Sequence, residues 1–252
     1  MTRWRNLLRE AKDLLTAGRL HEALQLCDRA ALESEDARYG SALIRGAIHL
    51  ELGEPSAALS AYQAVADLSQ PDAELDCARG LAYFELAQIP EAEAAIRSAL
   101  SLDERLAQGH YTLGLILELK GSREANQHFL RARELAPRQY PEDRSRTREE
   151  FEDILNRAAA SLPEKVLEQL KQFPIVVADL PVLDELQKVQ PRMSPQSLAL
   201  VLGTNFGNGA QPCLLIFKRN VERAFRQDEL IEEGVRLAVI QEFTRALGLE
   251  HA

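Results

Sequence analysis

The chain has no window of about 18 uninterrupted apolar residues, the length that a membrane-spanning helix needs. Its first residues are charged throughout and lack the apolar run and small-residue cleavage site of a secretory signal peptide. Cysteine is scarce: only Cys27, Cys77 and Cys213 occur in 252 residues, far apart and odd in number. This usage favours reduced, mostly buried thiols over a disulfide framework. We therefore expect a cytoplasmic protein without a membrane span.

An excess of positive charge is also missing. The formal net charge is −9, and residues 1–149 and 150–252 are each net negative. Such a surface repels phosphate on average, so we expect no nucleic-acid partner. The sequence also lacks a phosphate-cradling glycine loop and a G-x-S-x-G turn. It does contain 46% hydrophobic and 27% charged residues, a globular composition in a chain long enough for two domains.

A repeat of about 34 residues fills the first half. Small residues recur in the later part of each repeat at Ala23, Ala58, Ala92 and Ala125. A second set of small residues precedes them, at Ala11, Gly46, Gly80 and Gly114. Small residues on both members of a helix pair let the two backbones approach closely. The pattern resembles tetratricopeptide (TPR) repeats, which implies a superhelix of about four helical hairpins over residues 1–137.

The resemblance to TPR proteins implies that a protein or peptide partner binds in a concave groove lined by the first helix of each hairpin. By that register the groove candidates are Arg5, Lys12, Leu43, Ala47, Glu51, Leu81, Glu85, Tyr111, Leu115 and Glu118. Glu51, Glu85 and Glu118 recur at nearly the repeat period. They either form an acidic ladder that steers a basic segment of a partner or are solvated surface charges.

A polar stretch, residues 138–150, predicts an exposed linker. Beyond it the repeat ends and the pattern becomes mixed. Residues 151–173 are amphipathic and helical with a break near Pro163, and three apolar runs in 174–181, 198–209 and 212–221 predict strands. The segment 228–247 predicts a closing helix. The fold class is therefore mainly α, with a C-terminal α+β domain over residues 151–252.

The order of these segments resembles the zincin-like domains of bacterial metallopeptidase families, in which the closing helix has the motif H-E-x-x-H-x-x-G-x-x-D. The resemblance places the first zinc-binding histidine at Gln241 and the catalytic glutamate at Glu242. It places the second histidine at Arg245, the glycine at Gly248 and the third ligand at His251. Glu242 and Gly248 match the motif, whereas the two histidines are replaced.

The replacements remove the chemistry that the motif supplies. A neutral amide such as Gln241 is a poor zinc ligand beside imidazole, and the guanidinium of Arg245 is permanently cationic. Without a metal, Glu242 has no bound water to activate. We therefore expect no metal, no cofactor and no peptidase activity, with Glu242 paired to Arg245 three residues later on the helix.

Three functional hypotheses remain open. The first is a non-catalytic scaffold or regulator, in which the TPR groove binds a partner and the degenerate domain is a second docking surface, or an inhibitor or chaperone-like partner of a co-produced enzyme. The second is a metallopeptidase with an atypical site built from Glu242 and His251. The third is a module in which only the repeats matter. A basic cluster, Lys218, Arg219, Arg223 and Arg226, is either a solvated helix face or a docking patch for an acidic surface.

Overall fold

The computed structural model describes residues 2–68, 71–142, 145–170, 174–189, 193–202, 213–225 and 227–246. It divides the chain into two compact units. The first is Met1–Pro141 together with Gln187–Pro195, and the second is Glu142–Leu186 together with Gln196–Ala252. Within the described residues, no helix is both long enough and apolar enough to cross a membrane. The cytoplasmic location expected from the sequence stays a prediction.

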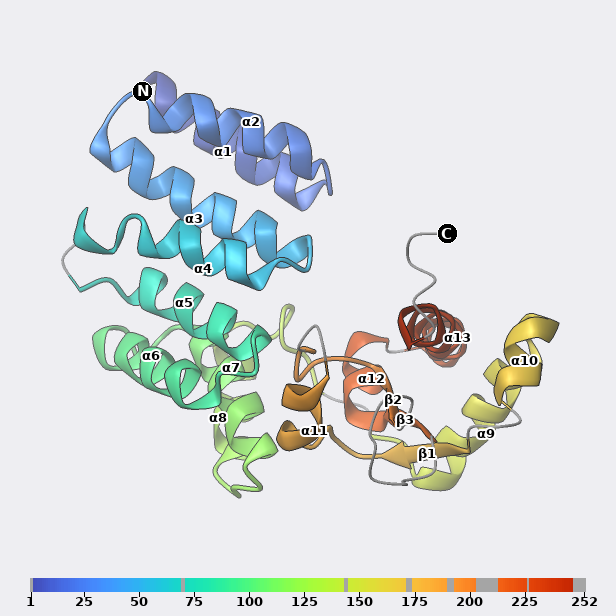
Figure 1. The fold of residues 1–252 in the computed structure, drawn as a ribbon. Helices are drawn as coiled ribbons and strands as arrows, with labels where there is room; N and C mark the ends of the chain where they lie inside the picture. The colour runs from blue at the N-terminus through green and yellow to red at the C-terminus, as the bar shows by residue number, and fades with distance from the viewer. Residues whose placement is uncertain are drawn as a thin grey trace. The chain divides into compact units, whose positions relative to one another are not determined.

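The first unit contains four antiparallel helical hairpins stacked one after another (Figure 1). Their helices are α1 (Arg3–Thr16), α2 (Leu20–Ala31), α3 (Glu35–Glu51), α4 (Pro55–Gln63), α5 (Ala73–Glu85), α6 (Ile89–Leu102), α7 (Ala107–Leu119) and α8 (Ala125–Leu135). A short 3-10 turn, η1 (Ala66–Leu68), follows α4. This is the arrangement of a TPR solenoid, as the 34-residue period predicted.

The small residues of the repeat lie where paired helices meet. Ala11, Ala23, Ala58 and Ala92 have no exposed surface. A methyl group added at Gly46 would overlap the ring of the buried Tyr62, which lies on the partner helix of the same hairpin. The small residues therefore set the distance between the two helices of each hairpin.

The turns between paired helices repeat as well. Gly18, Gly53 and Gly121 have φ values of +73°, +72° and +69°, the left-handed conformation in which a helix commonly ends. The third hairpin has Ala87 at the corresponding place, with φ of +54°. A left-handed alanine costs roughly 1–2 kcal/mol relative to glycine, so the repeat geometry is maintained there against a local preference.

The second unit is α+β, as expected. Its helices are α9 (Arg148–Ala160), α10 (Glu164–Leu170), α12 (Lys218–Ala224) and α13 (Asp228–Ala246), with α11 (Leu183–Lys188) at the boundary of the two units. Its strands are β1 (Ile175–Ala178), β2 (Ala199–Leu202) and β3 (Cys213–Phe217). All three strands fall in the predicted segments, and the break between α9 and α10 contains Pro163.

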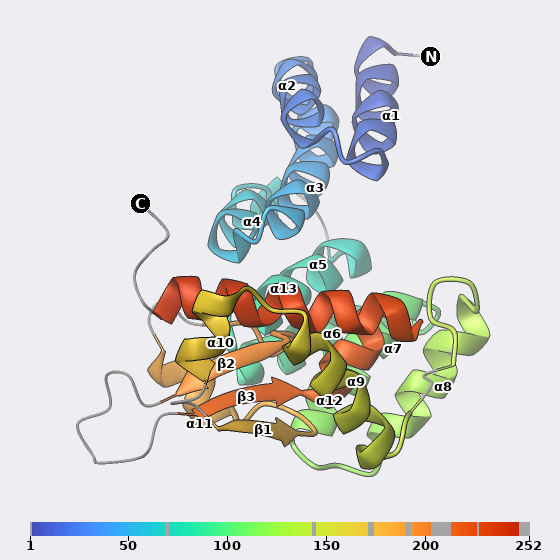
Figure 2. The same ribbon diagram turned by 90° about the vertical axis from the view of Figure 1, so that its right-hand side faces the viewer.

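The sheet has the order β1-β3-β2. β1 runs parallel to β3, with Val177 opposite Ile216, and β2 runs antiparallel to β3, with Leu200 opposite Leu215. The helix α13 packs against α9 and against the edge strand β2 (Figure 2). One apolar core joins these elements, with Phe151 and Ile216 at its fully buried centre.

The linker is shorter than the sequence indicated. The helix α9 begins at Arg148, inside the predicted linker of 138–150. Its start is fixed by a capping box, because Thr147 Oγ1 accepts from the Glu150 amide at 3.2 Å and Glu150 Oε2 accepts from the Thr147 amide at 2.8 Å. The polar stretch that suggested a linker therefore contains the first residues of helix α9.

Candidate functional site

The groove candidates lie on the first helices of the four hairpins, α1, α3, α5 and α7. Arg5, Lys12 and Glu51 are exposed, and six others are partly exposed: Leu43, Ala47, Leu81, Glu85, Tyr111 and Glu118. Leu115 is the exception, since it is only 4% exposed. It therefore contributes to packing and offers almost no surface to a partner, which corrects its place among the groove residues.

The three glutamates of the expected ladder have different surroundings. Glu51 is exposed at the end of α3, whereas Glu85 and Glu118 are partly buried. Glu85 Oε2 accepts a hydrogen bond from the Ser194 hydroxyl at 2.5 Å. Ser194 belongs to the short segment that groups with the repeats. One of the three glutamates of the expected ladder, Glu85, is therefore already hydrogen-bonded to a serine of the same chain.

The same segment makes a second contact with the third hairpin. Gln187 Nε2 donates to the carbonyl oxygen of Ala87 at 3.3 Å. A cavity of about 760 Å³ lies beside Glu85 and Ser194, bounded by the turn between α3 and α4 at Gly53 and Pro55. The surface near Glu85 is therefore shaped partly by residues far along the sequence from the repeats.

Tyr111 is part of an aromatic cluster. Its ring stacks on Tyr140 with centroids 4.6 Å apart and packs obliquely on Phe129 at 5.7 Å. Burial raises the pKa of the Tyr140 hydroxyl to about 12. The Tyr111 ring is thus packed against two aromatic neighbours, Tyr140 and Phe129.

In the second unit, two positions of the expected motif, Glu242 and Arg245, have structural contacts. Glu242 is 7% exposed and its Oε2 accepts from the Val201 amide of β2 at 3.3 Å. Arg245 donates from Nη2 to the same oxygen at 2.7 Å and from Nε to Oε1 at 3.3 Å. The pair expected from the sequence is therefore present, and it joins α13 to the edge strand of the sheet.

Only one of the other motif positions lies in the described part of the chain. Gln241 is exposed, whereas Gly248 and His251 lie outside the described residues. Within the parts of the chain that the structure describes, no group of three or more His, Cys, Asp and Glu side chains gathers in a way that could hold a metal ion.

The basic cluster of 218–226 is not a uniform solvated face. Lys218 pairs with Glu222 at 2.9 Å, and the two side chains are 7% and 5% exposed. The Lys218 ammonium also lies 6.0 Å from the centre of the Phe151 ring, and Arg219 is exposed. Lys218 therefore belongs to the core of the second unit, and it is part of neither a solvated helix face nor a docking patch. Arg226 lies outside the described residues.

The cysteines are unsuited to nucleophilic chemistry. All three are free thiols, and Cys27 and Cys77 are buried. Burial raises the pKa of Cys27 to about 11 and that of Cys77 to about 12, and it also raises the pKa of Cys213. The thiolate is the reactive form, so all three thiols are disfavoured as nucleophiles at neutral pH.

A comparison with protein-family models found no match, and a comparison with curated proteins also found none. Several solved structures are similar to the repeats. TTC0263, a thermophilic TPR protein of Thermus thermophilus, is 23% identical with a TM-score of 0.48, covering 53% of this chain and 75% of that one. MamA from Desulfovibrio magneticus is 25% identical with a TM-score of 0.44, covering 54% and 77%.

YrrB, whose structure is described as a TPR protein with an unusual peptide-binding site, is 19% identical with a TM-score of 0.34, covering 52% of this chain and 86% of that one. These likenesses cover about half of the present chain. The zincin-like resemblance of the second unit stays a prediction, and the function of the chain is inferred from its own residues.

Proposed function

We propose that the chain is a non-catalytic interaction protein whose repeats bind a basic, extended segment of a protein partner. The observation that supports this most directly is the placement of the groove candidates on the first helices of four stacked hairpins, with Glu51 exposed there. One hairpin cannot bury its apolar face alone, so stacking produces a continuous surface with repeated side-chain positions. Carboxylates on that surface attract basic residues of the partner.

Fluorescence anisotropy of a labelled lysine- and arginine-rich peptide, titrated with the full chain, tests this proposal. We expect binding that weakens as salt is raised, because exposed charges are screened. Glu51→Lys should weaken it by about fivefold, since one exposed charge contact contributes roughly 1 kcal/mol. Glu91→Lys is the matched control, because Glu91 is also exposed but lies on α6, the second helix of its hairpin. Affinity that is insensitive to Glu51→Lys contradicts a role for the acidic groove.

We further propose that the second unit is a degenerate zincin-like domain kept as a docking or folding unit. The engagement of Glu242 supports this proposal, because Arg245 and the Val201 amide occupy the oxygens that a general base would need free. A peptidase with a remodelled site requires a Glu242 carboxylate whose oxygens are free of such contacts. Elemental analysis of the purified chain discriminates the two: zinc at one equivalent, lost together with peptidase activity in Glu242→Ala, would establish the enzyme.

A further inference from the structure

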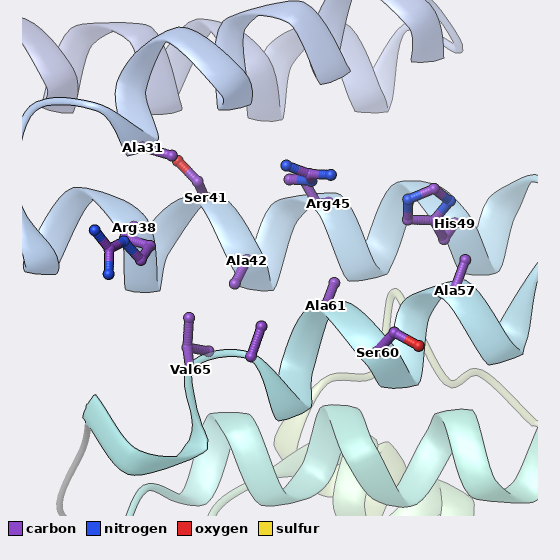
Figure 3. Close-up of a pocket in the computed structure, with 11 residues that line it drawn as sticks. Ala31, Arg38, Ser41, Ala42, Arg45, His49, Ala57, Ser60, Ala61 and Val65 are labelled. Atoms are coloured by element: carbon purple, nitrogen blue, oxygen red, sulfur yellow. The ribbon is translucent and has the colours of Figure 1, made fainter.

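A second cleft lies on the other side of the repeats from the proposed groove. It has a volume of about 500 Å³ and lies between α3 and α4, reaching Ala31 at the end of α2 (Figure 3). We call it the outer cleft. On α3 it is lined by Arg38, Ala42, Arg45 and His49, which are spaced by four, three and four residues. That spacing places them on one helical face, opposite the face of the groove candidates Leu43, Ala47 and Glu51.

The floor and far wall of the outer cleft are made mostly of small side chains, together with Val65. Ala57 and Ala61 face it from α4, with Ser60 beside them (Figure 3). Ser60 and Ala64, which also line the cleft, are exposed. Without bulky side chains, α4 forms a shallow groove that the ridge of another helix can enter closely. Leu32, which follows Ala31 in the sequence, is 88% exposed.

The wall formed by α3 is basic. Arg38 is exposed and has no side-chain hydrogen bond or ion pair among the described residues. Arg45 Nη1 pairs with the exposed Asp28 at 2.8 Å, but its Nε is buried without a hydrogen-bond partner. His49 Nδ1 lies 2.8 Å from Glu54 Oε2. The cleft thus combines an apolar floor with two guanidinium groups, of which Arg45 is paired with Asp28 and Arg38 is not paired within the described part of the chain.

From this combination we infer that the outer cleft binds an acidic amphipathic helix of a partner protein. The apolar face of such a helix covers the alanines of α4, and carboxylates along its flank pair with Arg38 and Arg45. The two arginines are seven residues apart, roughly 10 Å along α3. A partner helix crossing at a shallow angle therefore meets them with carboxylates two turns apart.

Two end-blocked synthetic helices of about 18 residues, long enough to be helical, test the inference. Both have leucine on one face, and the flanks are glutamate in one and lysine in the other. Anisotropy titration with the full chain should show saturable micromolar binding of the glutamate helix and at least tenfold weaker binding of the lysine helix. Arg38→Glu should weaken binding of the glutamate helix by about tenfold. Ser60→Trp, which fills the cleft from an exposed position, should abolish binding.

Matched controls are available on neighbouring surfaces. Gln63→Trp places the same bulky ring on α4 outside the cleft, and Arg9→Glu reverses an exposed charge on α1. Both variants should bind the glutamate helix as the unchanged chain does. Circular dichroism verifies that each variant is folded, and Ala64→Glu, at another exposed lining position, replaces Ser60→Trp if that variant fails to fold.

The inference is overturned if the glutamate helix does not bind, if both helices bind equally, or if Ser60→Trp binds like Gln63→Trp. It is also overturned if light scattering shows a concentration-dependent dimer that Ser60→Trp dissociates, because the occupant is then a second copy of this chain. Its failure leaves the basic-peptide test of the groove unaffected, because that test depends on Glu51 on the opposite face of α3.

Discussion

Buried polar side chains in this chain connect secondary-structure elements through side-chain hydrogen bonds and ion pairs. Glu242 is the main example, since it is buried on α13 and contacts both Arg245 and the amide of Val201 on the edge strand. An edge strand has amides that no neighbouring strand satisfies, so a carboxylate that accepts from one of them stabilises the helix–sheet contact. The residue that the motif assigns to catalysis therefore has a structural function in this chain.

Replacing Glu242 by alanine should lower the free energy of unfolding by about 3 kcal/mol, because the Arg245 charge and the Val201 amide would lose their acceptor. Urea denaturation followed by circular dichroism measures the change. Glu233→Ala is the control, because Glu233 forms an ion pair of the same spacing with Arg236 on the same helix but is exposed. We expect the free energy of unfolding of that variant to be close to that of the unchanged chain. Equal effects of the two substitutions would show that burial of the pair is unimportant.

His110 and His128 form a stacked pair in which protonation of His128 is coupled to folding. The rings stack with centroids 5.3 Å apart, and the two Nδ1 atoms are 3.0 Å apart. His110 Nε2 donates to the Glu104 carbonyl at 3.0 Å, so in the neutral ring Nδ1 is the acceptor and His128 Nδ1 donates to it. Burial, and next the neighbouring His110, lower the pKa of His128 below its ordinary value of 6.5.

Acidification should therefore destabilise the repeats. With a lowered pKa in the folded state, the unfolded chain binds more protons below about pH 6.5, so the free energy of unfolding falls as pH decreases from there. Urea midpoints between pH 7.5 and 5 measure the effect. His128→Gln, which cannot take up the proton, should reduce the pH dependence, whereas His21→Gln on an exposed site should not. A pH profile unchanged by His128→Gln would contradict the coupling.

At the scale of elements, three of the four hairpins depend on a close approach between their two helices at a glycine. Gly46 faces the Tyr62 ring, Gly80 faces Ile96, and Gly114 faces Phe129, so in each case a large side chain fills the space that a Cβ would need. The glycine lowers helix propensity, and the contact that it permits compensates. The sequence repeat is thus a repeat of helix–helix contacts.

Gly46→Ala should destabilise the chain by about 1–3 kcal/mol through overpacking against Tyr62, although alanine is the better helix former by roughly 1 kcal/mol. Thermal or urea unfolding measures the change. Tyr62→Leu makes room for the methyl group, so the double variant should be more stable than the sum of the single effects by at least about 1 kcal/mol. A neutral or stabilising Gly46→Ala would show that the helices can separate at little cost.

At the scale of the whole molecule, the described residues form cores that belong to different units. One cluster joins α9, the three strands, α12 and α13, and it contains Phe151. Other clusters join consecutive hairpins, one around Ala11 and Cys27 and another around Ala58 and Tyr62. Stability is therefore expected to vary along the chain, with separate regions responding to separate core substitutions.

Phe151→Ala should cost about 3–5 kcal/mol within the second unit, since its ring is fully buried. Hydrogen exchange measured by mass spectrometry should then increase in α9, α13 and the strands, while peptides from α3 to α6 keep their protection. Ile96→Ala, in the fully buried core of the repeats, should produce the reverse pattern. Loss of protection throughout the chain after either substitution would show that the two units unfold together.

Much of this architecture could be predicted because the signals are local. Gly46 and Ala58 lie only 12 residues apart, and the contact that they allow is formed within one hairpin. The β-branched run of β1 is flanked by prolines, which limits where a strand can begin and end. The pairing of Glu242 with Arg245 follows from helical spacing. In contrast, the capping box of Thr147 was obscured by the polar composition around it.

The sequence by itself therefore determined the helical hairpins, their period, the α+β character of the second half and the pairing of Glu242 with Arg245, because each of these depends on residues that are neighbours along the chain. Only the tertiary structure decided that Leu115 and Lys218 are buried, that Ser194 contacts Glu85, and that Arg38 and Arg45 line a cleft floored by alanines. The physical reason is that burial and charge pairing depend on which surfaces meet after folding, and the residues on those surfaces are distant in sequence.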